Sequence, residues 1–151
     1  MNRYYVYVHS IADTDTHALG GNIIYVGKGY GTRVGQSERV PSIISRSKKL
    51  NYPIDIEEAY NKNLVKKQII FYNLTSDEAF DVESALIRFY GLYASGGILF
   101  NATSGSAARY PDKNNILSTI AKKYPHILYC GKQTNAEITR QVYTHWKIHQ
   151  K

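Results

Sequence analysis

Apolar and polar residues alternate along two early stretches of the chain, which predicts two β-strands. The first stretch, residues 3–9, carries Tyr5, Tyr7 and His9 on one face and Tyr4, Val6 and Val8 on the other. The second covers residues 22–27, and the polar connection between them suits an antiparallel hairpin with a long loop. Residues 67–72 are also rich in apolar and aromatic side chains and predict a third strand.

Helical signals follow the third strand most clearly. Thr75 and Glu78 form a capping-box pattern, acidic residues crowd the first turn, and Gly91 supplies a stop signal after residue 90. Weaker patterns predict a helix over 31–50 that is broken near Pro41, and a short helix over 55–64. We therefore expect a small α/β (α+β) domain with a central three-stranded antiparallel sheet flanked by helices.

Net charge divides the chain into two parts. Residues 1–108 carry 11 Lys and Arg against 10 Asp and Glu, whereas residues 109–151 carry 8 against 2. Apolar positions around 115–123 and 135–149 recur at near-helical spacing. We expect residues 109–151 to form a basic helical extension that contacts a polyanion, nucleic acid before an anionic membrane, although a solvated basic tail has the same composition.

Several protein classes are disfavoured by composition. The single cysteine, Cys130, cannot form an internal disulfide, which favours a reducing compartment. No apolar run approaches the roughly 20 residues of a membrane span, and the start of the chain does not have the pattern of a signal peptide. We expect an intracellular, non-secreted protein with no membrane partner.

Glu83 interrupts an apolar stripe on the predicted 75–90 helix. Ala79, Glu83, Ile87 and Tyr90 share one face of that helix. A carboxylate there is costly unless it is paired or binds a cation. Glu83 is therefore either a metal ligand or one half of a structural ion pair with a neighbouring arginine.

A glycine-rich segment follows the second predicted strand. Gly27, Gly29 and Gly31 predict a turn in which the backbone can approach a ligand or another chain closely. Lys28 lies within it, but the segment is neither a phosphate-binding loop of the Walker type nor a complete G-x-G-x-x-G motif.

Taken in order, these pieces resemble the GIY-YIG nuclease family over residues 3–106. The half-motifs correspond to Tyr5-Val6-Tyr7, with Tyr5 in place of the glycine, and to Tyr25-Val26-Gly27 in YVGKGYGTR. Arg33 matches the family's arginine. Glu83, in E-x-x-L-I-x-x-Y-G, matches the metal-binding glutamate, and Asn101, in LFNATSGS, matches the asparagine.

The resemblance implies a metal-dependent DNA endonuclease that hydrolyses phosphodiester bonds. It assigns a single Mg²⁺, with Mn²⁺ as the alternative, to Glu83 as Lewis acid and leaving-group stabiliser. Arg33 would clamp the scissile phosphate, and Asn101 would order the site. Tyr7 is the candidate general base and Tyr25 the group that orients water, with an exchange of these two roles left open.

The implied partner is double-stranded DNA. Phosphate contacts from basic side chains would hold the duplex, and cutting both strands with one site needs a homodimer or two successive events. The basic residues assigned to DNA binding are Lys28, Lys113, Lys122, Lys123, Lys132, Arg140 and Lys147.

One position departs from the family pattern. Many members carry His or Tyr one helical turn after the arginine, where this chain has Ser37. Ser37 is the one feature that favours the alternative function, a catalytically silent nucleic-acid-binding module with the same fold. An RNA-binding or RNA-cleaving protein is a third hypothesis, disfavoured because the tyrosines fall mostly in predicted core strands.

Overall fold

The structure is a computed structural model, and it describes residues 3–11, 22–31, 39–102 and 122–129 of the 151-residue chain. Sequence predictions that fall elsewhere lie outside these residues, including the helix over 135–149 and residues 32–38 of the predicted 31–50 helix, which contain Ser37. No helix in the described ranges combines the length and the apolar run that crossing a membrane requires.

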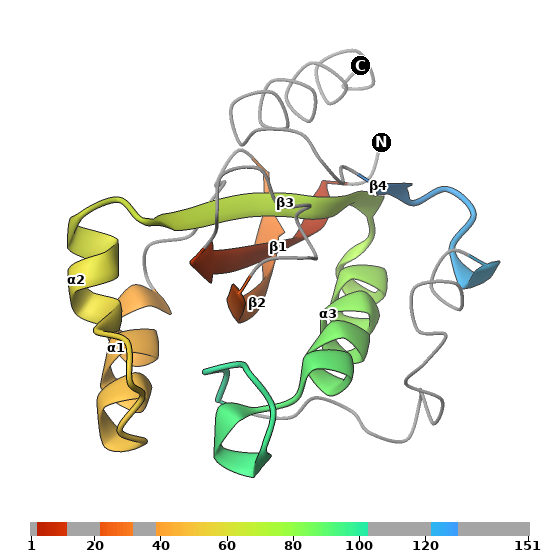
Figure 1. The fold of residues 1–151 in the computed structure, drawn as a ribbon. Helices are drawn as coiled ribbons and strands as arrows, with labels where there is room; N and C mark the ends of the chain where they lie inside the picture. The colour runs from red at the N-terminus through yellow and green to blue at the C-terminus, as the bar shows by residue number, and fades with distance from the viewer. Residues whose placement is uncertain (1–2, 12–21, 32–38, 103–121, 130–151) are drawn as a thin grey trace.

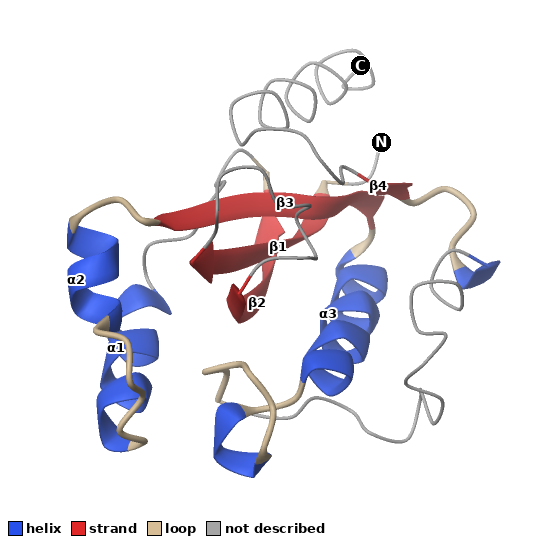
Figure 2. Cartoon of the chain, in the orientation of Figure 1, coloured by secondary structure: helices blue, strands red, loops and turns tan. Residues whose placement is uncertain are grey.

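The predicted antiparallel sheet is confirmed and gains one short strand (Figures 1 and 2). β1 (Tyr4–Ile11) lies in the centre and pairs with β2 (Asn22–Tyr30) on one side and β3 (Val65–Leu74) on the other. β4 (Leu128–Tyr129) pairs with Phe71 and Tyr72 of β3. The strand order is therefore β2-β1-β3-β4, and its last member comes from the region expected to be a separate extension.

Helices accompany the sheet, and four of them lie wholly within the described residues. They are α1 (Val40–Lys49), α2 (Ile56–Asn61), α3 (Ser76–Tyr90) and η2 (Tyr93–Ser95). α1 and α2 lie beside each other at one end of the sheet, and α3 runs beneath it (Figure 1). Pro41 does not break α1 but lies in its first turn, where its missing N–H has no intrahelical acceptor to lose.

The predicted ends of α3 are confirmed. Thr75 Oγ1 accepts from the Glu78 backbone N–H at 3.2 Å, and Glu78 Oε1 accepts from the Thr75 N–H at 2.9 Å, which completes the capping box. Gly91 follows the last turn with φ of 76°, a conformation that costs glycine little.

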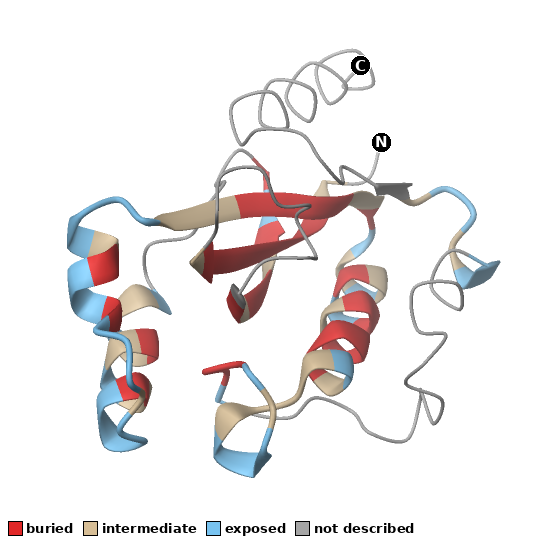
Figure 3. Cartoon of the chain, in the orientation of Figure 1, coloured by how far each residue is buried: buried red, intermediate tan, exposed pale blue. Residues whose placement is uncertain are grey.

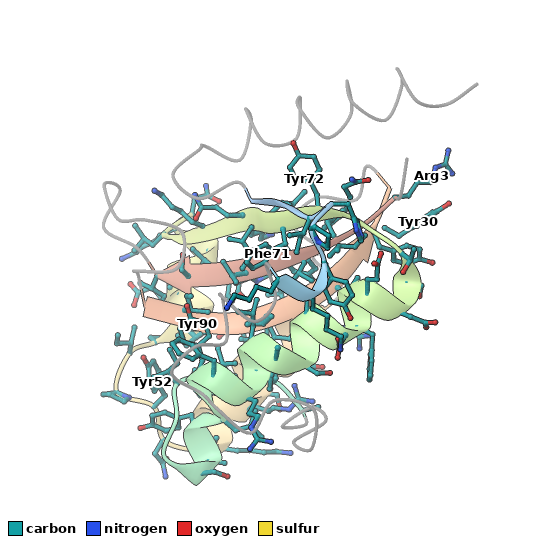
Figure 4. The ribbon with its side chains drawn as sticks, turned by 90° about the vertical axis from the view of Figure 1, so that its right-hand side faces the viewer. Arg3, Tyr30, Tyr52, Phe71, Tyr72 and Tyr90 are labelled. Atoms are coloured by element: carbon teal, nitrogen blue, oxygen red, sulfur yellow. The ribbon has the colours of Figure 1, made fainter. Side chains whose placement is uncertain are left out.

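The two faces of β1 separate as the alternation predicts. Val6 and Val8 pack with Val82 and Leu86 in the core between the sheet and α3, whose sheet-facing side is buried (Figure 3). Tyr5, Tyr7 and Ile69 form a second buried cluster with Tyr25 and Tyr72. Figure 4 shows Tyr72 pointing away from α3, and Arg3 beside Tyr30, to which its Nη1 donates at 2.9 Å.

The prediction of a turn at Gly27 and Gly29 was wrong, because both residues lie inside β2. Gly27 is paired with Tyr7 and Gly29 with Tyr5, and each tyrosine ring lies across the glycine backbone. A Cβ at Gly27 would lie 2.3 Å from Tyr7 Cζ, and one at Gly29 would lie 2.1 Å from Tyr5 Cε2. The close approach predicted for the glycines is thus made by side chains of the neighbouring strand.

Residues 122–129 pack against the domain through polar contacts with α3. The buried Asp81 carboxylate accepts from Lys123 Nζ at 2.8 Å and from the Tyr124 hydroxyl. Glu78 Oε2 lies 2.8 Å from His126 Nε2. Together with β4, these contacts make this part of the predicted extension a component of the main domain.

Candidate functional site

A polar pocket of about 210 Å³ lies between α1, α3, Tyr25 of β2 and residues 101–102. It brings together three residues expected at the site, Tyr25, Glu83 and Asn101. The described residues that line it are Tyr25, Arg39, Ser42, Arg46, Glu83, Ile87, Asn101 and Ala102. Opposite charges therefore meet in one small cavity, with a carboxylate on α3 facing two guanidinium groups from α1 and its N-cap.

Glu83 is one of two residues in the apolar stripe of α3 that line the pocket, and the other is Ile87. Its carboxylate accepts a hydrogen bond from the Lys28 backbone N–H of β2. Burial raises the pKa of Glu83, and the charge of Lys28, this hydrogen bond and the charge of Arg39 oppose the rise. Within the described part of the chain Glu83 forms no ion pair, so the structure offers no support for a direct pairing with a neighbouring arginine.

Tyr25 and Tyr7 are neighbours but are placed differently. Tyr25 lines the pocket, whereas Tyr7 is 1% exposed and lies behind it, with the ring centroids 6.1 Å apart. A hydrogen bond joins the side chains of Tyr7 and Tyr25. Burial, then the charge of Tyr25, raises the pKa of Tyr7, and burial with the charge of Glu83 raises that of Tyr25, against the lowering effect of Arg39.

Asn101 fixes the pocket to the sheet. Its Oδ1 accepts from the Val26 N–H at 3.1 Å, and its Nδ2 donates to the Val26 carbonyl at 2.6 Å. Phe100 N also donates to the Ile24 carbonyl at 2.8 Å. Asn101 thus uses both ends of its amide on the backbone next to Tyr25, a positioning role that agrees with its expected part in ordering the site.

We expect Asn101→Asp to destabilise the protein by about 2–3 kcal/mol, because the Val26 carbonyl loses its donor and faces a second acceptor instead. Urea unfolding measures this difference. Asn63→Asp, on the exposed end of the α2–β3 connection, is the control and should change stability by less than about 0.5 kcal/mol. Equal effects of the two substitutions would contradict the role assigned to Asn101.

Arg39 and Arg46 were not predicted as site residues. Arg39 is the N-cap residue of α1, and Arg46 lies two turns along the same helix, where its Nη1 donates to the Phe100 carbonyl at 3.2 Å. The sequence alone does not distinguish Arg39 and Arg46 from other polar residues on the exposed side of an amphipathic helix. Arg33, the arginine that the resemblance selects, lies outside the described residues.

His9 is a further buried group next to the two tyrosines. It is fully buried, its Nδ1 lies 2.7 Å from the Tyr60 hydroxyl, and its ring centroid is 5.5 Å from that of Tyr7 and 5.6 Å from that of Tyr25. Burial, with the charge of Lys67, lowers the pKa of His9 from 6.5 to about 3. His9 is therefore neutral in the folded protein at neutral pH.

This depressed pKa predicts acid sensitivity. Unfolded His9 binds a proton below pH 6.5 and folded His9 only near pH 3, so His9 makes the protein less stable as pH falls between these values, by up to about 1.4 kcal/mol per pH unit. Urea unfolding at several pH values should show a shallower loss for His9→Gln than for wild type. Parallel curves would contradict a neutral buried His9.

The remaining predicted DNA-contacting residues are placed as follows. Lys28 Nζ donates to Ser76 Oγ at 2.8 Å and lies over the Tyr4 ring. Lys122 is exposed, and Lys123 pairs with Asp81. The others, which lie outside the described residues, are Lys113, Lys132, Arg140 and Lys147.

Comparison with known proteins gives no information about the function of this chain. No family model, curated protein or solved structure matches the chain. Among the described residues, no three His, Cys, Asp or Glu side chains group together as a metal site.

Proposed function

We propose that the protein is a metal-dependent DNA endonuclease of the GIY-YIG type. The observation that carries the proposal is the meeting of Tyr25, Glu83, Arg39 and Arg46 in one small pocket held to the sheet by Asn101. Phosphodiester hydrolysis needs a cationic clamp for the phosphate, a carboxylate for a divalent cation and a hydroxyl to orient water. The pocket supplies each of these from this chain.

The pocket fits Mg²⁺, or Mn²⁺ in its place. One carboxylate is a normal protein contribution for Mg²⁺, which keeps several waters and takes further oxygens from phosphates. Bound at Glu83, the ion would act as a Lewis acid and stabilise the leaving 3′-oxygen. Because Arg39 and Arg46 repel a lone dication, we expect metal to bind more tightly when a phosphate is present.

The arginines bind and neutralise the substrate phosphate. Arg39 is exposed at the pocket mouth and Arg46 is half-buried deeper along α1. Guanidinium groups match phosphate oxygens with paired hydrogen bonds and stay charged throughout the reaction. We therefore assign to them the clamp that the resemblance gave to Arg33, whose contribution stays a prediction.

Of the two tyrosines we assign the water-facing role, including that of general base, to Tyr25. Burial raises the pKa of Tyr7, so Tyr7 keeps its proton. Burial and the charge of Glu83 also raise the pKa of Tyr25, but the charge of Arg39, the hydrogen bond with Tyr7 and the charge of Arg46 oppose that rise. A cation at Glu83 would also cancel the negative charge that raises this pKa. This reverses the order preferred from the sequence, where Tyr7 was the candidate base.

Nicking of supercoiled plasmid tests the proposal. We expect wild-type protein with Mg²⁺ at low salt to yield nicked or linear DNA, and EDTA to abolish the product. Arg39→Gln and Arg46→Gln should each slow cutting by about 10²-fold, whereas Lys62→Gln, on the exposed end of α2, should not. DNA binding without cutting would indicate the silent binding module, and neither binding nor cutting would refute the proposal.

The setting follows from the same proposal. A DNA-cutting enzyme with one cysteine and a net charge of +7 suits the reducing interior of a cell, where its substrate is found. We therefore propose an intracellular enzyme that acts on duplex DNA as monomer or homodimer.

A further inference from the structure

A second pocket adjoins the candidate active site. It measures about 220 Å³ and lies between the C-terminal turn of α1 and residues 92–102. It shares Arg46, Asn101 and Ala102 with the first pocket. A molecule bound in the first pocket could therefore extend into the second without leaving the protein surface.

The second pocket has apolar walls and a cationic rim. Apolar side chains line the walls of the pocket, namely Leu50, Leu92, Leu99 and Phe100. The cationic side chains that line it are Arg46 and Lys49. Of the described residues that line it, none is acidic, and Lys49 forms no ion pair with the described residues. Such a pocket fits a flat, weakly polar ring that is joined to an anion.

Its walls are held in place before any ligand binds. Phe100 is 1% exposed, makes edge-to-face contact with Tyr52 at 4.9 Å, and is tied to β2 through its backbone N–H. Leu99 N–H donates to the Gly91 carbonyl at 2.9 Å, and Tyr93 N–H donates to the Leu99 carbonyl at 2.8 Å. Little conformational entropy is lost when a pre-formed pocket is filled.

We propose that this pocket holds the base of the nucleotide next to the cleaved phosphate, a hypothesis that rests on the proposed nuclease function. The volume is below the roughly 300–1,000 Å³ of pockets for drug-sized ligands, which limits the occupant to one ring system. Arg46, at the junction, would hold the phosphate between the two pockets, and Lys49 the next phosphate along the strand.

The proposal defines a substrate class. A base in this pocket has left the helical stack, which costs a few kcal/mol in paired duplex and least where the base is already unpaired. The enzyme should therefore prefer DNA with a bulged, mismatched or single-stranded nucleotide at the cut. Hydrogen-bonding groups for base edges are few, since Asn101 is committed to Val26, so we expect little base identity preference.

Binding of a mononucleotide tests the pocket independently of cleavage. The probes are 2′-deoxyadenosine 5′-monophosphate, 2-deoxyribose 5-phosphate and inorganic phosphate, titrated into protein with labelled leucine methyl groups. We expect the nucleotide to shift the methyl signals of Leu50, Leu92 and Leu99 and to bind about tenfold more tightly than the sugar phosphate. Equal affinities with no methyl shifts would overturn the proposal.

A matched pair of substitutions extends the test to DNA. Ala94 is exposed and lines the pocket, and Ser95 is exposed on the same 3-10 turn but does not line it. Ala94→Trp should weaken nucleotide binding about tenfold and remove the preference for bulged over fully paired DNA, whereas Ser95→Trp should leave both unchanged. Wild-type cutting of paired and bulged DNA at equal rates would overturn the base pocket alone, while absence of all cutting would overturn the nuclease function.

Discussion

Gly27→Ala should destabilise the protein by about 2–4 kcal/mol, a large effect for the addition of one methyl group. The new Cβ would lie 2.3 Å from Tyr7 Cζ and 2.5 Å from the Tyr7 hydroxyl oxygen. Tyr7 is buried, so its ring cannot move aside without displacing Tyr25 or opening the strand pair. Chemical unfolding measures the loss of stability.

A double-mutant cycle separates this clash from other effects of alanine in a strand. Tyr7→Leu removes the ring atoms that the new Cβ would meet, so Gly27→Ala should cost less in the Tyr7→Leu background than in wild type. Gly96→Ala is the comparison for backbone strain alone, since φ there is 93° and no atom lies within 4 Å of the new Cβ. Additive effects of Gly27→Ala and Tyr7→Leu would contradict the packing explanation.

Glu83→Gln should reduce DNA cleavage by about 1,000-fold or more, equivalent to about 4 kcal/mol of transition-state stabilisation, while the protein stays at least as stable as wild type at pH 7. The two effects have opposite signs for one reason. The pKa of Glu83 is raised in the folded protein, so its ionised form is held there at a cost that the neutral amide avoids. Plasmid nicking and thermal unfolding measure the two effects.

The same raised pKa gives a pH dependence. Wild-type cutting should fall as pH drops through the raised pKa of Glu83, because the protonated carboxyl no longer attracts a metal ion. The stability advantage of Glu83→Gln should shrink over the same range. Glu57→Gln, which alters an exposed partner of Lys48, is the control and should leave cutting unchanged. A Glu83→Gln protein that unfolds more easily and still cuts would contradict the assignment.

Much of the fold could be predicted from local signals. The capping box at Thr75 and the stop at Gly91 depend only on residues within a turn of each other, and both are found where the sequence places them. The alternation of Val6 and Tyr7 likewise fixes the two faces of β1, because side chains in a strand point to opposite sides in turn.

The errors and omissions involve contacts between distant segments. Gly27 was predicted to lie in a turn because the need for glycine comes from Tyr7, 20 positions earlier, and not from the local backbone. Arg46 was missed because its relation to Glu83 arises only when α1 and α3 reach the same pocket. The burial of Asp81 was not predicted because its partners, Lys123 and Tyr124, lie 42 and 43 positions later in the chain.

The hydrogen bonds around the pocket also affect whether the edge of the sheet can pair with a second copy of this chain. β2 is an outer strand of the sheet, and four of its backbone groups are hydrogen-bonded by the pocket residues. The Ile24 carbonyl accepts from Phe100 N, both Val26 groups bond to the Asn101 amide, and the Lys28 N–H donates to Glu83. A bare outer strand is a template for pairing with another chain and hence for aggregation. The residues that build the pocket therefore also cover an outer strand that could otherwise pair with another chain, so we expect loss of the Asn101 side chain to favour self-association.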